Sequence, residues 1–316
     1  VSGAYDFQWN NMDADMYGFV HPTRWNHMLS LATSLAWGGF KMQGSVVYNY
    51  VHDVTRDVES PADKNTWTPA VFLYYKPFAE VGFSLRAFYK KSFRMPTFND
   101  LYYAEMGNSK LNPEYTTQYD IGFAYYSKRM KGLLYEWAVQ VDGYRNFVSD
   151  KIVAYPKGAQ FRWTMLNLGK VHINGLDAKM SATFRPVRKL YFTTRLQYTY
   201  QQAIDVTNPA DTYYRDQIPY IPWQSGSAVV QMDYGTWGLN YSFIYTGERY
   251  NQQENIIYNH TQPWYTHDLS VQKSFCWRNY QAKVALEVNN LLSQDYDVIL
   301  NYPMPKRNYR VTLTFE

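Results

Sequence analysis

Apolar and polar residues alternate with a period of two along most of the chain. Between 133 and 147 the large apolar side chains occupy odd positions, while Glu136, Gln140 and Asp142 fall between them. The stretches 172–184, 190–200 and 307–315 repeat the pattern. Because successive side chains of a β-strand point to opposite faces, the pattern predicts strands with one apolar and one polar face. No stretch has a convincing helical period, so the sequence predicts an all-β chain.

Further strands are predicted by the same alternation, and the connections between strands differ in length in a regular way. The strands fall at roughly 4–9, 29–37, 41–52, 67–76, 81–91, 115–127, 226–234, 237–246, 265–277 and 280–292, which brings the total to about 14. Long loops lie near 10–27, 53–66, 93–114, 148–161, 202–222, 247–263 and 293–305, and short turns lie between them. This predicts successive hairpins whose long loops all lie at one end of the sheet.

The predicted strands are long, at about 9–15 residues. A soluble β-sandwich, or a β-solenoid, also alternates, but sandwich strands average about 5–6 residues with turns every 8–12. Long strands with one polar face and short turns at one end are typical of a transmembrane antiparallel β-barrel. Lipid offers no hydrogen-bond partners, so a spanning sheet must close on itself. We therefore favour the barrel.

The aromatic content changes the picture further. The chain has 32 Tyr, 17 Phe and 10 Trp among 316 residues, and aromatic residues make up 19%. This excludes an intrinsically disordered chain, and the lack of long apolar runs excludes a bundle of transmembrane helices. Tyr and Trp favour membrane interfaces. Aromatic residues on apolar stripes near strand ends are therefore predicted to form girdles: Tyr135, Trp137, Trp237, Tyr241, Tyr245, Tyr265 and Trp277.

Charge and cysteine content exclude several other classes. A net charge of +4 without a basic block implies no nucleic-acid partner. The single Cys276 excludes a disulfide framework and a cysteine-based zinc site. The chain has no initiator Met and opens at Val1 directly into an alternating segment. We therefore expect 1–316 to be a single barrel region, incomplete at its N-terminus, from a longer or processed protein.

Three stretches resemble the C-terminal barrel of TonB-dependent outer-membrane receptors. The first and most specific is FRMPTFNDLYY at 93–103, followed by GNSKLNPE at 107–114. The second is NLG at 167–169 with GLD at 175–177, and the third is VNNLL at 288–292 with YPMPKR at 302–307. Lys306 stands where the family usually has Gly, and Glu316 follows the customary terminal aromatic residue, Phe315. The resemblance extends over about 67–316.

This resemblance implies a fold and a function. Family members have a 22-stranded barrel, an N-terminal plug domain and a segment that contacts the TonB complex, so the chain would supply the last 14 strands without the plug. The implied function is energised uptake of a scarce, bulky ligand across the outer membrane of a Gram-negative bacterium. The first stretch is most similar to the corresponding loop of vitamin B12 (cobalamin) receptors. Its resemblance to haem and siderophore receptors is weaker. The implied partners are outer-membrane lipid, TonB and, for some members, a surface lipoprotein.

Aromatic residues in the long loops are the candidate ligand contacts, because aromatic side chains give a large contact area at low entropic cost. The candidates are Phe98, Tyr102, Tyr103, Trp163, Tyr213, Tyr214, Tyr250, Tyr258 and Trp264. For any one of them, packing within the loops is the competing interpretation. The stretch between Arg94 and Glu114 is interpreted as a loop pinned over the barrel rim rather than as a ligand contact.

Other kinds of site have weaker signals. An acidic loop could supply oxygen ligands to calcium through Asp53, Asp57, Glu59 and Asp63, although its spacing matches no EF-hand. No other metal or cofactor is expected. An enzyme would need a nucleophile motif or paired acids and bases, and we find none, so we expect no catalysis. A passive porin, with a charged constriction in a polar lumen, remains the main alternative.

Overall fold

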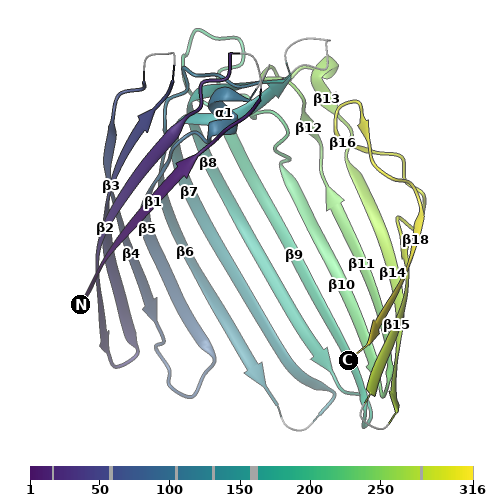
Figure 1. The fold of residues 1–316 in the computed structure, drawn as a ribbon. Coiled ribbons are helices and arrows are strands. Elements are labelled where there is room, and N and C mark those ends of the chain that lie inside the picture. Colours follow the sequence, from purple (N-terminus) through teal and green to yellow (C-terminus); the bar gives the residue numbers. More distant parts are fainter. Residues whose placement is uncertain are drawn as a thin grey trace.

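The computed structural model describes residues 1–15, 18–56, 60–103, 106–129, 132–156, 163–277 and 280–315, with the backbone alone at Tyr155, Pro156, Trp277 and Tyr280. One antiparallel sheet of 14 strands follows the order of the chain (Figure 1). Its strands are β1 (Ser2–Asn11), β2 (Thr23–Trp37), β3 (Phe40–Val54), β4 (Lys64–Tyr75), β5 (Phe83–Arg94), β6 (Glu114–Lys128), β7 (Leu134–Pro156), β8 (Trp163–Phe184), β9 (Leu190–Asp205), β10 (Gln224–Tyr234), β11 (Trp237–Thr246), β14 (Trp264–Trp277), β15 (Tyr280–Asn289) and β18 (Asn308–Phe315). The predicted all-β class and strand order are confirmed.

The long loops gather at one end of this sheet, as predicted, and carry short elements of their own (Figure 1). These elements are the helix α1 (Phe98–Tyr102), the 3-10 helix η1 (Ile257–Asn259), and the strand pairs β12 (Arg249–Tyr250) with β13 (His260–Thr261) and β16 (Asp297–Ile299) with β17 (Tyr302–Pro303). We call this end the mouth. No helix in the described part of the chain is long and apolar enough to cross a membrane.

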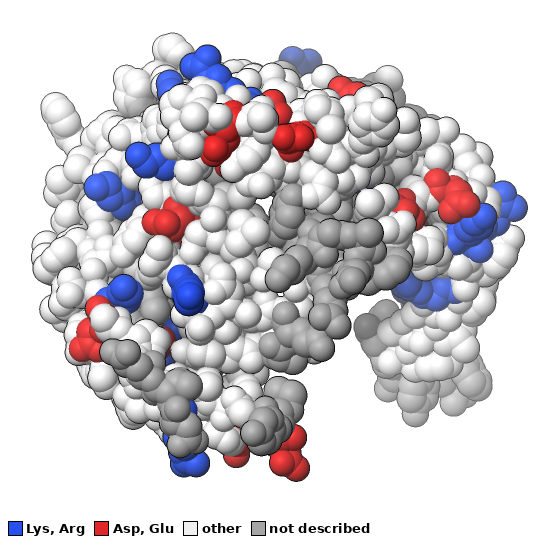
Figure 2. All heavy atoms as spheres, turned by 90° about the horizontal axis from the view of Figure 1, so that it is seen from above, with Lys and Arg blue, Asp and Glu red and all other residues white. Residues whose placement is uncertain are grey.

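Strand register separates the two faces of the sheet. Arg86 pairs with Gly122, which pairs with Asp142, and the Arg86 Nε lies 2.8 Å from the Asp142 Oδ1 on this polar face. The next row along these strands, Ala87 with Ile121 and Gly143, is apolar. Seen from the mouth, the sheet bends into an arc that is open on one side (Figure 2). The alternation therefore gives the arc a polar wall and an apolar wall.

Three features of the fold differ from the sequence prediction. Strand β2 begins at Thr23, inside the predicted loop 10–27, because it pairs with β1 up to the Asn11–Thr23 pair. Strands β7 and β8 have 23 and 22 residues: β7 extends to Pro156, into the predicted loop 148–161, and β8 begins at Trp163, ahead of the predicted strand start at 172. The alternation is lost there because Asp150 has a positive φ of 53°, although the pairing continues beyond it. The third feature is helix α1, which has a single turn and so no detectable period.

Two clusters of fully buried apolar side chains lie at the mouth end of the sheet. The larger joins β7, β8 and β9 to the following loop and contains Val148, Leu168, Val171, Ile173, Ala203 and Ile218. The smaller contains Leu101 of α1, Leu111 and Ile152 of β7. The buried core is therefore concentrated where the loops fold onto the strands, and it holds the mouth in shape.

The sheet has two edges, formed by β1 and β18. Each of these strands pairs on one side only with another described strand, β1 with β2 and β18 with β15. Both edge strands are exposed along their described length. Unpaired strand edges expose hydrogen-bonding groups that lipid cannot satisfy. The 14 strands thus form a large open arc, not a closed cylinder.

Candidate ligand-binding mouth

A buried arginine fixes one side of the mouth. Arg24 of β2 donates from Nε to the Asp53 Oδ1 at 2.7 Å and from Nη2 to the Asp53 Oδ2 at 2.6 Å. Its Nη1 donates to the Pro96 carbonyl at 2.8 Å, and its guanidinium lies 5.0 Å from the centre of the Phe98 ring. The side chains of Arg24 and Asp53 are 11% and 4% exposed. One side chain therefore ties strands β2 and β3 to the loop that carries α1.

Helix α1 positions three of the predicted aromatic residues. Thr97 caps the helix, with its side chain accepting from the Asp100 amide while the Asp100 carboxylate accepts from the Thr97 amide. Such a capping box satisfies two free amides of the first turn. The Phe98 and Tyr102 rings lie 6.2 Å apart, so Phe98 packs between Arg24 and Tyr102. Phe98 is thus a structural residue of the mouth.

Tyr102, the last residue of α1, is half-buried, and Tyr103, which follows it, is exposed. Tyr102 lines a cleft of ≈ 520 Å³, and burial together with the Asp53 carboxylate raises the pKa of its hydroxyl, which therefore stays a neutral donor. Tyr103, at the end of the helix, is 52% exposed. The cleft lies between three loops and is lined by Gly18, Phe19, Val20, Ser60, Pro61, Leu101, Tyr102, Gly107 and Ser109. Its mixed apolar and polar lining suits an amphipathic ligand.

Two pairs of aromatic rings, joined by a backbone hydrogen bond, connect β8 to the β12–β13 hairpin. The ring of Trp163 lies 6.4 Å from the ring of Tyr220, whose amide donates to the Tyr250 carbonyl at 2.7 Å. The Tyr250 ring meets His260 edge-on at 5.9 Å. The structure therefore brings the predicted Trp163 and Tyr250 together through Tyr220, which the sequence reasoning missed. Its positive φ of 61° falls within a turn and gives no sequence signal.

The other predicted aromatics fall in different surroundings. Tyr213 and Tyr214 are half-buried in the 206–223 loop, where Arg215 lies 5.8 Å from the Tyr214 ring centre. The Trp264 ring stacks on Tyr296, another missed residue, at 4.6 Å and 26°. Packing within the loops accounts for these contacts.

Tyr258 in η1 is different from all of these, because its side chain is 89% exposed. Tyr103 and Tyr258 are therefore the predicted aromatics with the most surface free for a ligand.

Of the four calcium candidates, two already bind side chains of the protein and two lie outside the described residues. Asp53 is bound to Arg24, and Asp63 accepts from the Tyr50 hydroxyl at 2.5 Å and lies 2.6 Å from the His52 Nδ1. Asp57 and Glu59 lie outside the described residues. No group of three or more metal-ligating side chains occurs within the part of the chain that the structure describes. Calcium at this loop stays a prediction.

Acid should release the start of β4 from β3. Hydrogen bonds from Tyr50 and His52 lower the pKa of Asp63, so the attachment is present above the ordinary carboxyl pKa and is lost as the pH falls through the lowered value. We expect hydrogen exchange at 60–65, corrected for intrinsic rates, to accelerate as the pH falls below the usual Asp pKa of about 3.9. Asp63→Asn should remove this pH dependence. An equal acceleration in the variant would contradict the assignment.

Comparisons with known proteins show which family has this architecture. Residues 3–291 match the family model described as "TonB dependent receptor-like, beta-barrel". The chain belongs to this family. It is therefore part of a TonB-dependent receptor barrel of the Gram-negative outer membrane, in a family of transporters and not of enzymes. The apolar wall of the arc is the wall that faces lipid.

Relatives of this receptor barrel are distant. The vitamin B12 transporter BtuB of Photobacterium profundum is 26% identical over 267 residues, which cover 83% of this chain and 39% of the relative. The ferric preacinetobactin receptor BauA of Acinetobacter baumannii superposes with a TM-score of 0.70 at 15% identity, covering 93% of this chain and 43% of that one. The copper transporter OprC gives 0.69 at 15%, covering 92% and 48%. The chain thus spans less than half the length of these relatives.

Proposed function

We propose that this chain is the C-terminal barrel region of a receptor that captures a scarce, bulky ligand at the cell surface and imports it with energy from TonB. Cobalamin is the proposed ligand, with haem and an iron-siderophore as the alternatives. The relative that is 26% identical over 83% of this chain is a vitamin B12 transporter, which supports cobalamin. The plug and the TonB-contact segment of the complete receptor would couple import to energy.

The observation that carries the proposal is the set of accessible aromatic side chains at the mouth. Tyr258 and Tyr103 are 89% and 52% exposed, and Tyr102 lines the cleft beside α1. The packing of Trp163 on Tyr220 and the Arg24–Asp53 pair hold the loops in place. A pre-formed site of this kind binds a large ligand without a high ordering cost. Flat aromatic faces suit the flat ring system of a corrin.

The same features favour a receptor over a passive porin. A porin needs a charged constriction that an inward loop forms within an open lumen. Here α1 is fixed at the mouth by Arg24, and the Arg86–Asp142 pair neutralises charge on the polar wall. The receptor proposal explains both the family and the accessible aromatic residues.

Ligand binding by the complete receptor tests the proposal. Replacing both Tyr103 and Tyr258 with Ala should weaken cyanocobalamin binding by about tenfold or more, since an interface aromatic contributes about 1–2 kcal/mol. Tyr234→Ala is the matched control, because Tyr234 is 56% exposed but lies at the short turn between β10 and β11. Binding of haemin and a ferric siderophore is measured in parallel. No binding of any of the three, or equal affinities in both variants, would contradict the proposal.

A further inference from the structure

The lipid-facing surface of β5 to β8 has a pattern of charge that membrane insertion alone does not require. Strand register arranges its side chains in successive rows, with Gly143 beside Ile121, Arg145 beside Tyr119, and Phe147 beside His172. Lys91 pairs with Thr117, in the row of Phe147, and Lys170 pairs with Ser149, one row nearer the mouth. Three cations therefore lie within three consecutive rows.

The charge on this surface has one sign. The described lipid-facing positions in these rows of β5 to β8 contain no Asp or Glu, whereas the opposite face carries Asp120, Asp142 and Asp177. Arg145 is exposed, and its guanidinium lies 5.0 Å from the centre of the Phe147 ring. Among the described carboxylates, none forms an ion pair with Lys91, Arg145 or Lys170. Within the described part of the chain these cations have no carboxylate partner, which leaves them available to an anion from outside the chain.

The depth of the cations places them at the outer boundary of the membrane. Trp137, whose ring lies 4.7 Å from Tyr125, marks the girdle near the short turns. From Trp137 to Phe147 the strand runs about 33 Å, which is about 25 Å along the membrane normal at a tilt of about 40° and matches the apolar band of such barrels. Arg145 and its neighbours therefore lie where lipid headgroups of the outer leaflet begin.

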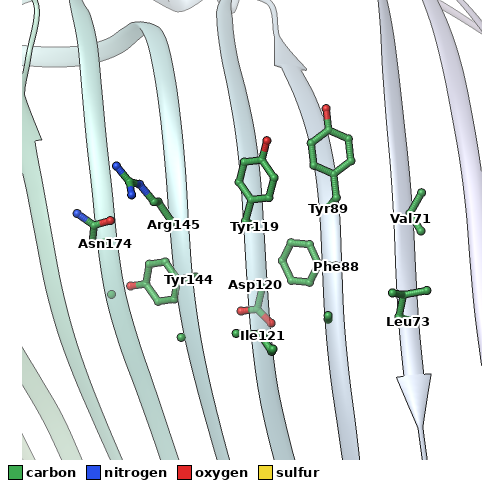
Figure 3. A pocket seen from close by; sticks show the side chains of 13 residues that line it. Val71, Leu73, Phe88, Tyr89, Tyr119, Asp120, Ile121, Tyr144, Arg145 and Asn174 are labelled. Carbon is green, nitrogen blue, oxygen red and sulfur yellow. The ribbon is translucent and has the colours of Figure 1, made fainter.

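Directly beneath the cations lies an apolar groove. It has a volume of ≈ 620 Å³, and the residues that line it include Leu73, Ala87, Ile121, Gly143 and Arg145. Figure 3 shows this groove, with strands β8 to β4 running from left to right. In Figure 1 the same strands run in the opposite order, because there they are seen from inside the arc, behind β1 and β18. Leu73, Ala87, Ile121 and Gly143 form one row of the apolar face, which places the groove on the lipid-facing side.

Small residues create the groove. Ala87 and Gly143 lie on either side of Ile121, whose side chain is 70% exposed. A Cβ added at Gly143 would have only the Ile121 carbonyl oxygen within contact range, at 4.0 Å. The space beside Ile121 is therefore open, and Tyr89 and Tyr119 bound it on the mouth side (Figure 3). An extended hydrocarbon chain fits such a space better than a compact ligand.

We propose that this surface binds a lipid of the outer leaflet that carries two phosphate groups, with one acyl chain in the groove and the phosphates against Lys91, Arg145 and Lys170. The spread of the cations indicates more than one phosphate. Lys91 lies on β5 and Lys170 on β8, three strands apart, or about 14 Å at the usual strand spacing. Arg145 lies between them and offers a planar fork that fits phosphate oxygens.

Lipid binding to the complete receptor in detergent tests this proposal, with diphosphoryl lipid A as the probe and native mass spectrometry as the readout. Each cation near a charged lipid contributes about fivefold in affinity. The variant with Lys91, Arg145 and Lys170 all replaced by Gln should therefore bind about 100-fold more weakly. Gly143→Leu, which fills the groove without changing charge, should also weaken binding. Monophosphoryl lipid A should bind less tightly than the diphosphoryl form.

The matched control replaces cations of the opposite face, Lys90, Lys179 and Arg195, with Gln. Lys90 and Lys179 lie on the same strands as Lys91 and Lys170, and Arg195 lies on β9. This variant should bind lipid A as the parent does, and heat-dependent gel mobility would show that all variants are folded. Equal binding by the two triple variants, or equal binding of phosphatidylcholine and lipid A, would overturn the proposal. Cobalamin affinity is measured separately, so either proposal can fail alone.

Discussion

Replacing Arg24 with Met is expected to release helix α1 from the barrel wall. The substitution leaves the Asp53 carboxylate, 4% exposed, without its bidentate partner, and it removes the donor to the Pro96 carbonyl and the cation over Phe98. Breaking a buried ion pair from one side costs about 3–5 kcal/mol, mainly because a desolvated charge is left behind. We expect the free energy of local opening at 97–103, measured by hydrogen exchange on the complete receptor, to fall by that amount.

Two further variants separate the buried charge from loss of packing. Arg94→Met removes the cation at the end of β5, which is 50% exposed and lies 3.3 Å from Asp100 and 3.8 Å from Glu114. Both carboxylates keep a backbone amide donor, from Thr97 and from Ile152, and the cation is half-exposed, so this variant should change opening by less. The double variant Arg24→Met with Asp53→Leu should recover much of the loss, because neither charge remains. An effect of Arg94→Met as large as that of Arg24→Met would refute the argument.

The second large effect is expected at Arg249, the first residue of β12, which is 2% exposed. Its Nη1 donates to the Gln262 carbonyl at 3.2 Å, and its Nη2 donates to the carbonyls of Asp297 and Val298 at 2.6 and 3.1 Å. Arg249→Ala removes the buried donor of all three bonds and opens a cavity. At about 1.5–3 kcal/mol for a hydrogen bond from a charged group, the two loops should separate locally and bind ligand more weakly.

Disulfide trapping between the hairpin and the last loop would measure this separation. Cysteines introduced at 262 and 298 in a Cys276→Ser background report the distance between the two loops. Cross-linking should be faster in the protein that keeps Arg249 than in the Arg249→Ala variant. Arg249→Lys should not restore the parent rate, since a compact ammonium does not present the same planar fork of donors. Identical rates in all three would show that Arg249 does not hold the loops together.

The wall of this barrel could be predicted from the sequence, because alternation is a local property. The polar face that carries Arg86 and Asp142 follows from this alternation, whereas their ion pair across β6 was not predicted. The ends of the strands were harder to predict. In β7 the positive φ at Asp150 interrupts the alternation, and the following residues look like a loop although they continue to pair with β8.

The mouth could be predicted only in part. The loop aromatics were found by type, but residue type does not separate Tyr258, which is 89% exposed, from Trp264, which is stacked on Tyr296. The Arg24–Asp53 pair was missed because its members are 29 positions apart and each is ordinary within its own strand. Contacts between loops depend on how the whole arc brings them together, which no local pattern records.

Strands β7 and β8 also show that the chain folds in two solvents. From Phe147 to Pro156, β7 continues for about 30 Å along its axis, well beyond the lipid-facing rows and into water. There Ile152 is buried against Leu101 and Leu111, in a small core of the kind found in soluble proteins. In lipid, apolar contact provides no such driving force, because the surroundings are equally apolar. Hydrophobic stabilisation weakens on cooling, so the extracellular core should become less stable at low temperature. The hydrogen-bonded wall within the bilayer does not depend on that effect and should keep its stability.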